Sequence, residues 1–313
     1  FCPADSEVSH LSHPPRLALR LLREMLAPYE EQGTQTVLTG ARLVACDASA
    51  DTIRSVTVEI GGEKMLVTGE IFLDATDTGE LIALSGTAYR VGAESRAETG
   101  ETHAPETGDP TDMQPATYTA AIENRRTGDF VIPKPELYDT FRRLKMPYDD
   151  YPVFSMYGPD SSTGRAKRFG MFPGERDDAG QELFPLFKYR RIVNAAYFTD
   201  GSEPYDVTLV NWPQNDFFLG NLFDCPDAAE NDRLARQFTL SFVYWLQTEA
   251  PRADGGQGYP FFRLAGEYLG TQDGLSKAPY IRESRRIRSR FTVTEEMIRR
   301  GSHPAFPDCV GVG

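Results

Sequence analysis

The chain has 313 residues, of which 40% are hydrophobic and 25% charged, a composition typical of folded globular proteins and not of disordered ones. Acidic residues outnumber basic ones by 46 to 33, so the formal net charge of −13 repels phosphate backbones and anionic lipids. We therefore expect a small-molecule partner, no nucleic acid and no membrane, while composition says nothing about the oligomeric state.

The ends and the cysteines add two expectations. Cys2, Cys46, Cys225 and Cys309 form no CxxC pair and predict reduced thiols, although four cysteines leave a disulfide open. The chain begins without methionine and ends in Val-Gly-Val-Gly, with no capping element at either end. We expect a fragment of a longer protein.

No metal site is predicted, because the HxxH at His10 lacks a third ligand nearby.

The first elements in chain order are a helix and three strands. Prolines in the first turn and a single apolar face predict a helix over residues 12–32. Strands are predicted near 36–46, 52–60 and 65–73, and Gly61-Gly62 forms a two-residue turn between the last two.

The third strand leads into the most informative stretch. Ile71-Phe72-Leu73 is apolar on successive residues, as in a strand that is covered on both faces of an α/β sheet. The small-residue turn Asp74–Gly79 then follows at the carboxyl end, where open α/β sheets bind ligands, and a flat cofactor can approach its backbone. The alternative is an ordinary strand-to-helix turn with Asp77 or Thr78 as N-cap.

The rest of the chain predicts a second group of elements. Strands are expected at 117–123, 183–198, 205–212 and 283–293, and helices at 136–144, 224–250 and 294–300. The helix at 224–250 has an apolar stripe of Leu234, Phe238, Phe242 and Trp245. We place domain boundaries so that residues 1–115, 116–278 and 279–313 form successive parts.

A basic segment, Tyr280–Phe291, is a candidate site. If it is a strand, Arg285 and Glu283 share a mostly apolar face, whereas Arg288 lies on the other face. A buried charge needs a partner or a ligand, so Arg285, oriented by Glu283, is expected to face the anionic part of a cofactor or substrate. A structural ion pair explains the same residues.

A polar segment follows the strand at 205–212. Its amides and carboxylate lie between Trp212 and Phe217 and suit a polar, hydroxyl-rich substrate: Asn211, Gln214, Asn215 and Asp216. Simple turn formation by Asn and Asp is the alternative.

Several common signatures are absent. The sequence has no GxSxG, no GxxxxGK[ST] and no HExxH, which removes the usual support for three hydrolase classes. It also has no strand–GxGxxG–helix unit, the loop that normally holds a dinucleotide pyrophosphate.

Five long blocks resemble, in order, a bacterial family of FAD-dependent oxidoreductases with the glutathione-reductase-type flavin fold. They are LDATDTGELIALSG, TLVNWPQNDFFLGNLFD, SFVYWLQTEAPRADGGQGYP, GTQDGLSKAPYIRESRRIR and FPDCVGVG. The family's glycine-rich loop and its last flavin-contacting strand and helix lie outside this chain, so the resemblance implies a central fragment.

The resemblance implies an α/β fold and a set of cofactor contacts. Residues 1–115 would be part of an FAD-binding domain with a three-stranded meander, 116–278 a mixed-sheet α+β substrate domain, and 279–313 a return strand and helix. The implied FAD contacts are Val44, Ala75, Thr76, Asp77, Thr78, Gly79, Arg282 and Arg286, with Arg285 at or near the isoalloxazine.

Together these observations predict an enzyme whose FAD accepts a hydride from an organic, hydroxyl-rich substrate. Arg285 would tune the flavin's charge, and Glu283 and Asp216 are the first carboxylates to test as a general base. The alternative is a carbohydrate- or partner-binding module without catalysis, which binds no FAD.

Overall fold

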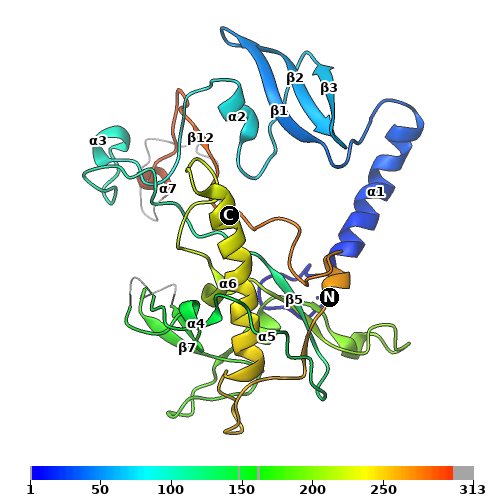
Figure 1. Ribbon diagram of the computed structural model, residues 1–313, viewed down its shortest axis with the longest axis vertical. Coiled ribbons are helices and arrows are strands. Elements are labelled where there is room, and N and C mark those ends of the chain that lie inside the picture. The colour runs from blue at the N-terminus through cyan, green and yellow to red at the C-terminus, as the bar shows by residue number, and fades with distance from the viewer. Residues whose placement is uncertain (1, 147–148, 161–162, 299–313) are drawn as a thin grey trace. The chain divides into compact units, whose positions relative to one another are not determined.

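The computed structural model describes residues 2–146, 149–160 and 163–298 (Figure 1). The chain forms two compact units. Unit 1 comprises Phe1–Gln35 and Pro115–Tyr280, and unit 2 comprises Thr36–Gln114 and Ile281–Gly313. The first helix therefore belongs to unit 1 by its contacts. The functional domain boundaries expected from the sequence stay predictions.

Unit 1 contains most of the secondary structure. Its elements are α1 (Pro15–Glu31), β5 (Ala120–Asn124), α4 (Tyr138–Phe141), β6 (Tyr157–Pro159), β7 (Ala166–Gly170), β8 (Phe184–Pro185), α5 (Leu186–Tyr189), β9 (Arg191–Val193), η1 (Ala195–Tyr197), β10 (Val207–Val210), η2 (Pro213–Asn215), α6 (Ala228–Thr248), β11 (Phe262–Leu264) and η3 (Gly266–Tyr268).

Unit 2 is built from shorter elements. They are β1 (Arg42–Ser49), β2 (Thr52–Ile60), β3 (Glu63–Thr68), α2 (Glu80–Leu84), β4 (Tyr89–Arg90), α3 (Arg96–Thr99), β12 (Arg286–Ile287) and α7 (Glu295–Ile298). Both units combine helices with sheets. The expected α/β class is therefore confirmed as a mixed α/β architecture with several sheets.

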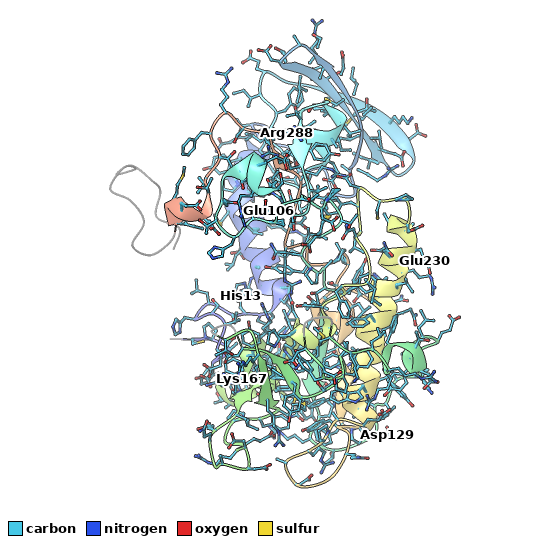
Figure 2. All side chains as sticks on the ribbon, turned by 90° about the vertical axis from the view of Figure 1, so that its left-hand side faces the viewer. His13, Glu106, Asp129, Lys167, Glu230 and Arg288 are labelled. Carbon is cyan, nitrogen blue, oxygen red and sulfur yellow. The ribbon has the colours of Figure 1, made fainter. Side chains whose placement is uncertain are left out.

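The core of unit 1 is aromatic and is organised by α6. This helix has an acidic residue, Glu230, in its first turn, where the helix dipole favours negative charge (Figure 2). Further along, Phe238, Phe242 and Trp245 are each at most 2% exposed and lie in one hydrophobic cluster. The apolar stripe expected on this helix is therefore its buried face.

The sheet beside this core has four strands in the order β11-β5-β10-β9, with antiparallel pairing throughout. Ala120 and Ile122 of β5 belong to the α6 cluster, whereas Ala121 belongs to a second cluster with Val193 and Val207. Successive residues of a strand point to opposite faces, so β5 is covered on both sides.

Unit 2 contains a three-stranded antiparallel sheet, β1-β2-β3. Val56 of β2 pairs with Cys46 on one side and Val67 on the other. The predicted turn at Gly61-Gly62 is confirmed: both glycines have positive φ, of 59° and 90°, between the paired residues Ile60 and Glu63.

Several strand predictions were wrong in extent, and the first of them, near 36–46, corresponds to β1 at Arg42–Ser49. β3 ends at Thr68, and residues 71–76 belong to no helix, strand or turn, with Ile71 80% and Leu73 90% exposed. The region predicted as strand 183–198 is broken into β8, α5, β9 and a 3-10 turn, and the region 283–293 retains only β12. An apolar run forms a strand only where a neighbouring backbone pairs with it, and sequence alone does not supply that neighbour.

Buried residues are few in unit 2. Among its described residues they are Ser55, Val56, Gly79, Leu81 and Gly92. Cys2, Cys46 and Cys225 are free thiols, whereas Cys309 lies outside the described residues. No helix of the described chain is long and apolar enough to cross a membrane.

We expect Phe238→Ala to destabilise unit 1 strongly. The Phe238 ring lies 5.2 Å from the Phe141 ring and 5.3 Å from the Phe154 ring, centroid to centroid, and its removal leaves a cavity. The free energy of unfolding should fall by about 3–5 kcal/mol in urea denaturation. Leu219→Ala, at a residue 41% exposed, should change it by less than about 1 kcal/mol. Equal losses would contradict this packing.

Candidate functional site

A cavity of about 450 Å³ lies in unit 2, within the size range of small-molecule sites. It is lined by Arg42, Leu43, Val44, Glu59, Lys64, Glu80, Ala83, Leu84 and Arg285. Three of these side chains are cationic and two are anionic. The cavity is therefore locally positive by one formal charge in a chain that carries −13.

The turn that leads into α2 is held by side chains of its own residues. Asp74 Oδ1 accepts hydrogen bonds from the Thr76 amide (3.0 Å) and hydroxyl (2.7 Å), and Oδ2 accepts one from the Leu81 amide (3.0 Å). Thr76 Oγ1 in turn accepts from the Gly79 amide at 2.9 Å. Asp74 and Thr76 thus satisfy the start of α2. The N-cap residue is Gly79, so the alternative interpretation with Asp77 or Thr78 as N-cap is wrong.

These hydrogen bonds set the protonation of the carboxylates. Partial burial acts to raise the pKa of Asp74, but the donors from Thr76, Leu81 and Ile82 outweigh it and bring the pKa below its ordinary 3.8. Burial likewise opposes ionisation of Glu80, whose pKa is nevertheless lowered by hydrogen bonds from threonine hydroxyls. Both groups are carboxylates at neutral pH.

Arg285 is seated against the same turn. Its Nη1 donates to the Thr78 carbonyl at 2.8 Å, and its Cζ lies 5.6 Å from the centre of the Tyr89 ring. Gly79 permits this approach. Its φ is +69°, and a Cβ there would lie 3.0 Å from Ile82 Cδ1 and 3.3 Å from Arg285 Cβ.

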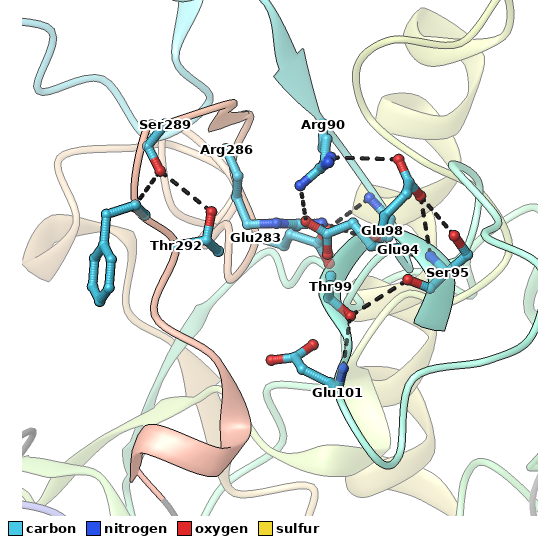
Figure 3. Close-up of polar contacts among 12 residues, drawn as sticks. Arg90, Glu94, Ser95, Glu98, Thr99, Glu101, Glu283, Arg286, Ser289 and Thr292 are labelled. Carbon is cyan, nitrogen blue, oxygen red and sulfur yellow. Dashed lines mark hydrogen bonds and ion pairs between the residues drawn. The ribbon is translucent and has the colours of Figure 1, made fainter. Parts of the chain in front are cut away.

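The neighbouring residues of Arg285 anchor the segment to the loop after β4. Glu283 Oε1 accepts a hydrogen bond from the Gly92 amide at 2.8 Å, and Oε2 accepts one from the Gln114 amide at 3.0 Å. Arg286 pairs with Glu283 and with Glu94, at 3.0 Å from the latter (Figure 3). Glu283 is thus engaged on both oxygens by backbone amides and an arginine.

The residues predicted around this site fall into two groups. Val44 and Arg285 line one cavity, and the backbone of Thr78 and Gly79 contacts Arg285. Ala75, Thr76 and Asp77 are exposed, and Arg282 is half-buried outside the cavity lining. Arg286 faces Glu283, Glu94 and the Gly92 carbonyl instead of the cavity. The expected FAD contacts of these residues stay predictions.

The polar segment at 211–216 lies in unit 1 and is largely buried. Asn215 is 0% exposed; its Nδ2 donates to the carbonyls of Tyr118 and Val210, both at 3.1 Å, and its Oδ1 accepts from the Trp212 amide. Gln214 donates to the Tyr157 carbonyl at 3.0 Å. Asp216 Oδ1 accepts a hydrogen bond from the Thr117 hydroxyl. Structural hydrogen bonds account for the Asn215 amide, whereas the buried Gln214 Oε1 has no hydrogen-bond partner among the described residues. The expected substrate contacts of Asn211, Gln214, Asn215 and Asp216 stay predictions.

The sequence did not reveal that the three-stranded sheet brings the charged residues Arg42, Glu59 and Lys64 to the cavity. Glu59 on β2 is the cross-strand partner of Arg42 on β1 and of Lys64 on β3. The Arg42–Glu59 pair is also an ion pair, with 3.2 Å between Nη2 and Oε1. Opposite charges near the ends of three consecutive strands are the signal that could have revealed this ladder.

Comparison with known proteins gives one match. A family model described as FAD dependent oxidoreductase matches residues 3–313 of the chain. No curated protein and no solved structure matches it.

We expect Gly79→Ala to destabilise unit 2 more than Gly86→Ala. Both glycines have positive φ, which costs an L-residue about 1–2 kcal/mol. Only at Gly79 does the new methyl group also meet Ile82 and Arg285, for a further loss of roughly 1 kcal/mol or more, because nothing lies within 4 Å at Gly86. Hydrogen exchange of the amides in α2 measures the difference. Equal protection losses would mean that Arg285 does not pack against the turn.

We expect Asp74→Asn to lower stability at neutral pH. The folded-state pKa of Asp74 is depressed, so its carboxylate stabilises the fold above the unfolded pKa, and this contribution is lost as the pH falls through the folded pKa. The difference in urea midpoint between wild type and Asp74→Asn should therefore decrease as the pH falls from about 5 towards 3. Asp77→Asn is the matched control, because this exposed side chain makes no hydrogen bond to any other described residue. A difference that stays constant with pH would contradict the assignment.

Proposed function

The chain belongs to the family of FAD-dependent oxidoreductases, and from this membership and the cavity in unit 2 we propose that it carries part of the flavin site of a substrate-oxidising enzyme. FAD is the cofactor that the family implies. The proposed reaction is hydride transfer to the flavin from an organic, hydroxyl-rich substrate.

One observation carries the proposal. A guanidinium, that of Arg285, is held by the Thr78 carbonyl at the edge of a cavity of ligand size, next to a turn of small residues. Bound FAD would supply the hydride-accepting ring, whose pyrimidine side gains negative charge on reduction. A cation that is already held in place stabilises such charge without reorganisation.

The chemistry of the donor set fits a dinucleotide. Arg42, Lys64 and Arg285 give the cavity its positive balance, which suits the phosphates and the charge that develops on the ring. Val44 also lines the cavity, and Gly79 leaves open the space that a Cβ would fill. We propose that the β1-β2-β3 sheet is the meander of a glutathione-reductase-type FAD domain, and that residues 116–278 form the substrate domain.

We propose a positioning role for Glu283. Its two oxygens hold the Gly92 and Gln114 amides and Arg286, which fixes the backbone two residues from Arg285. These three donors occupy most of the acceptor sites of the carboxylate, which favours a positioning role over proton abstraction. We therefore assign no general base, and the substrate contacts proposed for Asn211, Gln214, Asn215 and Asp216 require their segment to open.

The second candidate is a carbohydrate- or partner-binding module that binds no FAD. It is favoured by the absence of a strand–GxGxxG–helix unit from the sequence and by the structural hydrogen bonds of Asn215. Titration of the protein with FAD separates the two candidates. Saturable quenching of flavin fluorescence supports the enzyme, and unchanged fluorescence and melting temperature support the module.

We expect Arg285→Met to lower the midpoint potential of the bound flavin. If the fixed cation stabilises the reduced flavin by about 1.4–2.8 kcal/mol, its loss lowers the two-electron midpoint potential by roughly 30–60 mV. Spectroelectrochemical titration measures the shift. Arg288→Met is the matched control, because Arg288 is exposed and does not line the cavity (Figure 2). Equal shifts in both variants would show that the effect on the midpoint potential is not specific to Arg285.

A further inference from the structure

A second cavity, of about 600 Å³, lies entirely within unit 1, and the proposed redox chemistry makes no use of it. It is bounded by β7, by the chain that follows β7 and by the loop after α6. Its lining residues include Arg168 and Phe169, Glu175 and Arg176, and Pro251 and Arg252. Three guanidinium groups therefore surround one hollow in a strongly acidic chain.

Part of the lining of this cavity is apolar. Met156 and Leu183 are 6% and 8% exposed, and Phe169 lies beside them in the lining. Glu175 accepts hydrogen bonds from the amides of Met171 (2.8 Å) and Phe172 (3.1 Å), which closes the turn after β7. These hydrogen bonds hold the backbone on one side of the cavity.

Two of the arginines have donors in excess of their partners. Among the described residues, Arg168 has one ionic contact, 3.9 Å from the fully exposed Asp178, and the side chain of Arg176 donates one hydrogen bond, to the Gly180 carbonyl at 2.7 Å. Each guanidinium has five N–H donors, so most of them are available to a ligand. Arg252 differs, because it is tied to Asp254 and to the Gly258 carbonyl.

The carboxylates of the lining do not cancel this charge. Glu175 is directed to two backbone amides, and Asp178 is exposed to solvent at more than hydrogen-bond distance from Arg168. The balance over the lining is three cations against two anions. Forked guanidinium donors beside apolar side chains match a carboxylate that is attached to a hydrophobic group. The guanidinium binds both carboxylate oxygens, and the apolar side chains contact the hydrophobic group.

We propose that this cavity is a binding site for a small organic carboxylate, held by Arg168 and Arg176 with its apolar part against Phe169 and Met156. The site is independent of the flavin site, because every lining residue belongs to unit 1. Its occupation requires no redox chemistry.

Benzoate and its neutral isostere benzamide test the proposal on the whole chain at constant ionic strength. Isothermal titration should show saturable benzoate binding in the millimolar range and at least tenfold weaker binding of benzamide. The double variant Arg168→Gln/Arg176→Gln should bind benzoate at least tenfold more weakly than wild type. Lys167→Gln, one residue along β7 and outside the lining, should bind as wild type does (Figure 2).

The following outcomes would overturn the proposal: no benzoate binding to wild type, equal binding of benzamide, or unchanged benzoate binding by the double variant. An equal loss in Lys167→Gln would overturn it as well, since it would indicate general charge screening. The melting temperature and circular dichroism of each variant, measured without ligand, verify that the fold is retained. FAD titration of the double variant should give the wild-type result, so failure here and failure of the flavin proposal are distinguishable.

Discussion

The organisation of unit 2 depends on the attachment of residues 283–286 to turns far away in the sequence. Glu283 accepts a hydrogen bond from the Gly92 amide, 191 positions away, and Arg285 donates to the Thr78 carbonyl, 207 positions away. Three of the five buried residues of the described unit are Gly79, Leu81 and Gly92, which lie in or beside these turns. With so small a core, charge-assisted hydrogen bonds to backbone carry an unusual share of the specificity.

The same attachment explains why adjacent arginines have different roles. Arg286 is in β12, opposite Arg90, and its guanidinium is neutralised by Glu283 and Glu94. Arg285 points to the cavity that the sheet and α2 share. Pairing Arg286 with carboxylates keeps the segment in register, and that register leaves the neighbouring cation at the cavity.

Unit 1 has a large core, and the polar groups buried beside it need hydrogen-bond partners. Its aromatic core around α6 leaves backbone groups at strand ends that water cannot reach, and buried amides such as Asn215 satisfy them. A polar side chain between aromatics therefore has a structural explanation here. Its arginines, in contrast, surround a hollow with more donors than acceptors, and this imbalance distinguishes a ligand site from a structural network.

The sequence by itself determined the local elements whose signals lie within a few residues. It located α6 by its apolar stripe and the hairpin at Gly61-Gly62 by its glycines. It also singled out Gly79 and Arg285, which the structure brings into contact and whose roles at a flavin stay predictions. It also carried the family likeness, which the match over residues 3–313 confirms.

Only the tertiary structure decided what each of those residues contacts. The strands expected at 65–73 and 283–293 are shorter than expected: β3 ends at Thr68, and β12 spans only Arg286–Ile287, where β4 pairs with it. The Arg42–Glu59–Lys64 ladder, the engagement of Glu283 and the burial of Asn215 depend on partners tens to hundreds of residues distant. Propensity and periodicity are local properties, whereas burial, pairing and the surroundings of a charge are set by whichever distant segment the folded chain brings beside it.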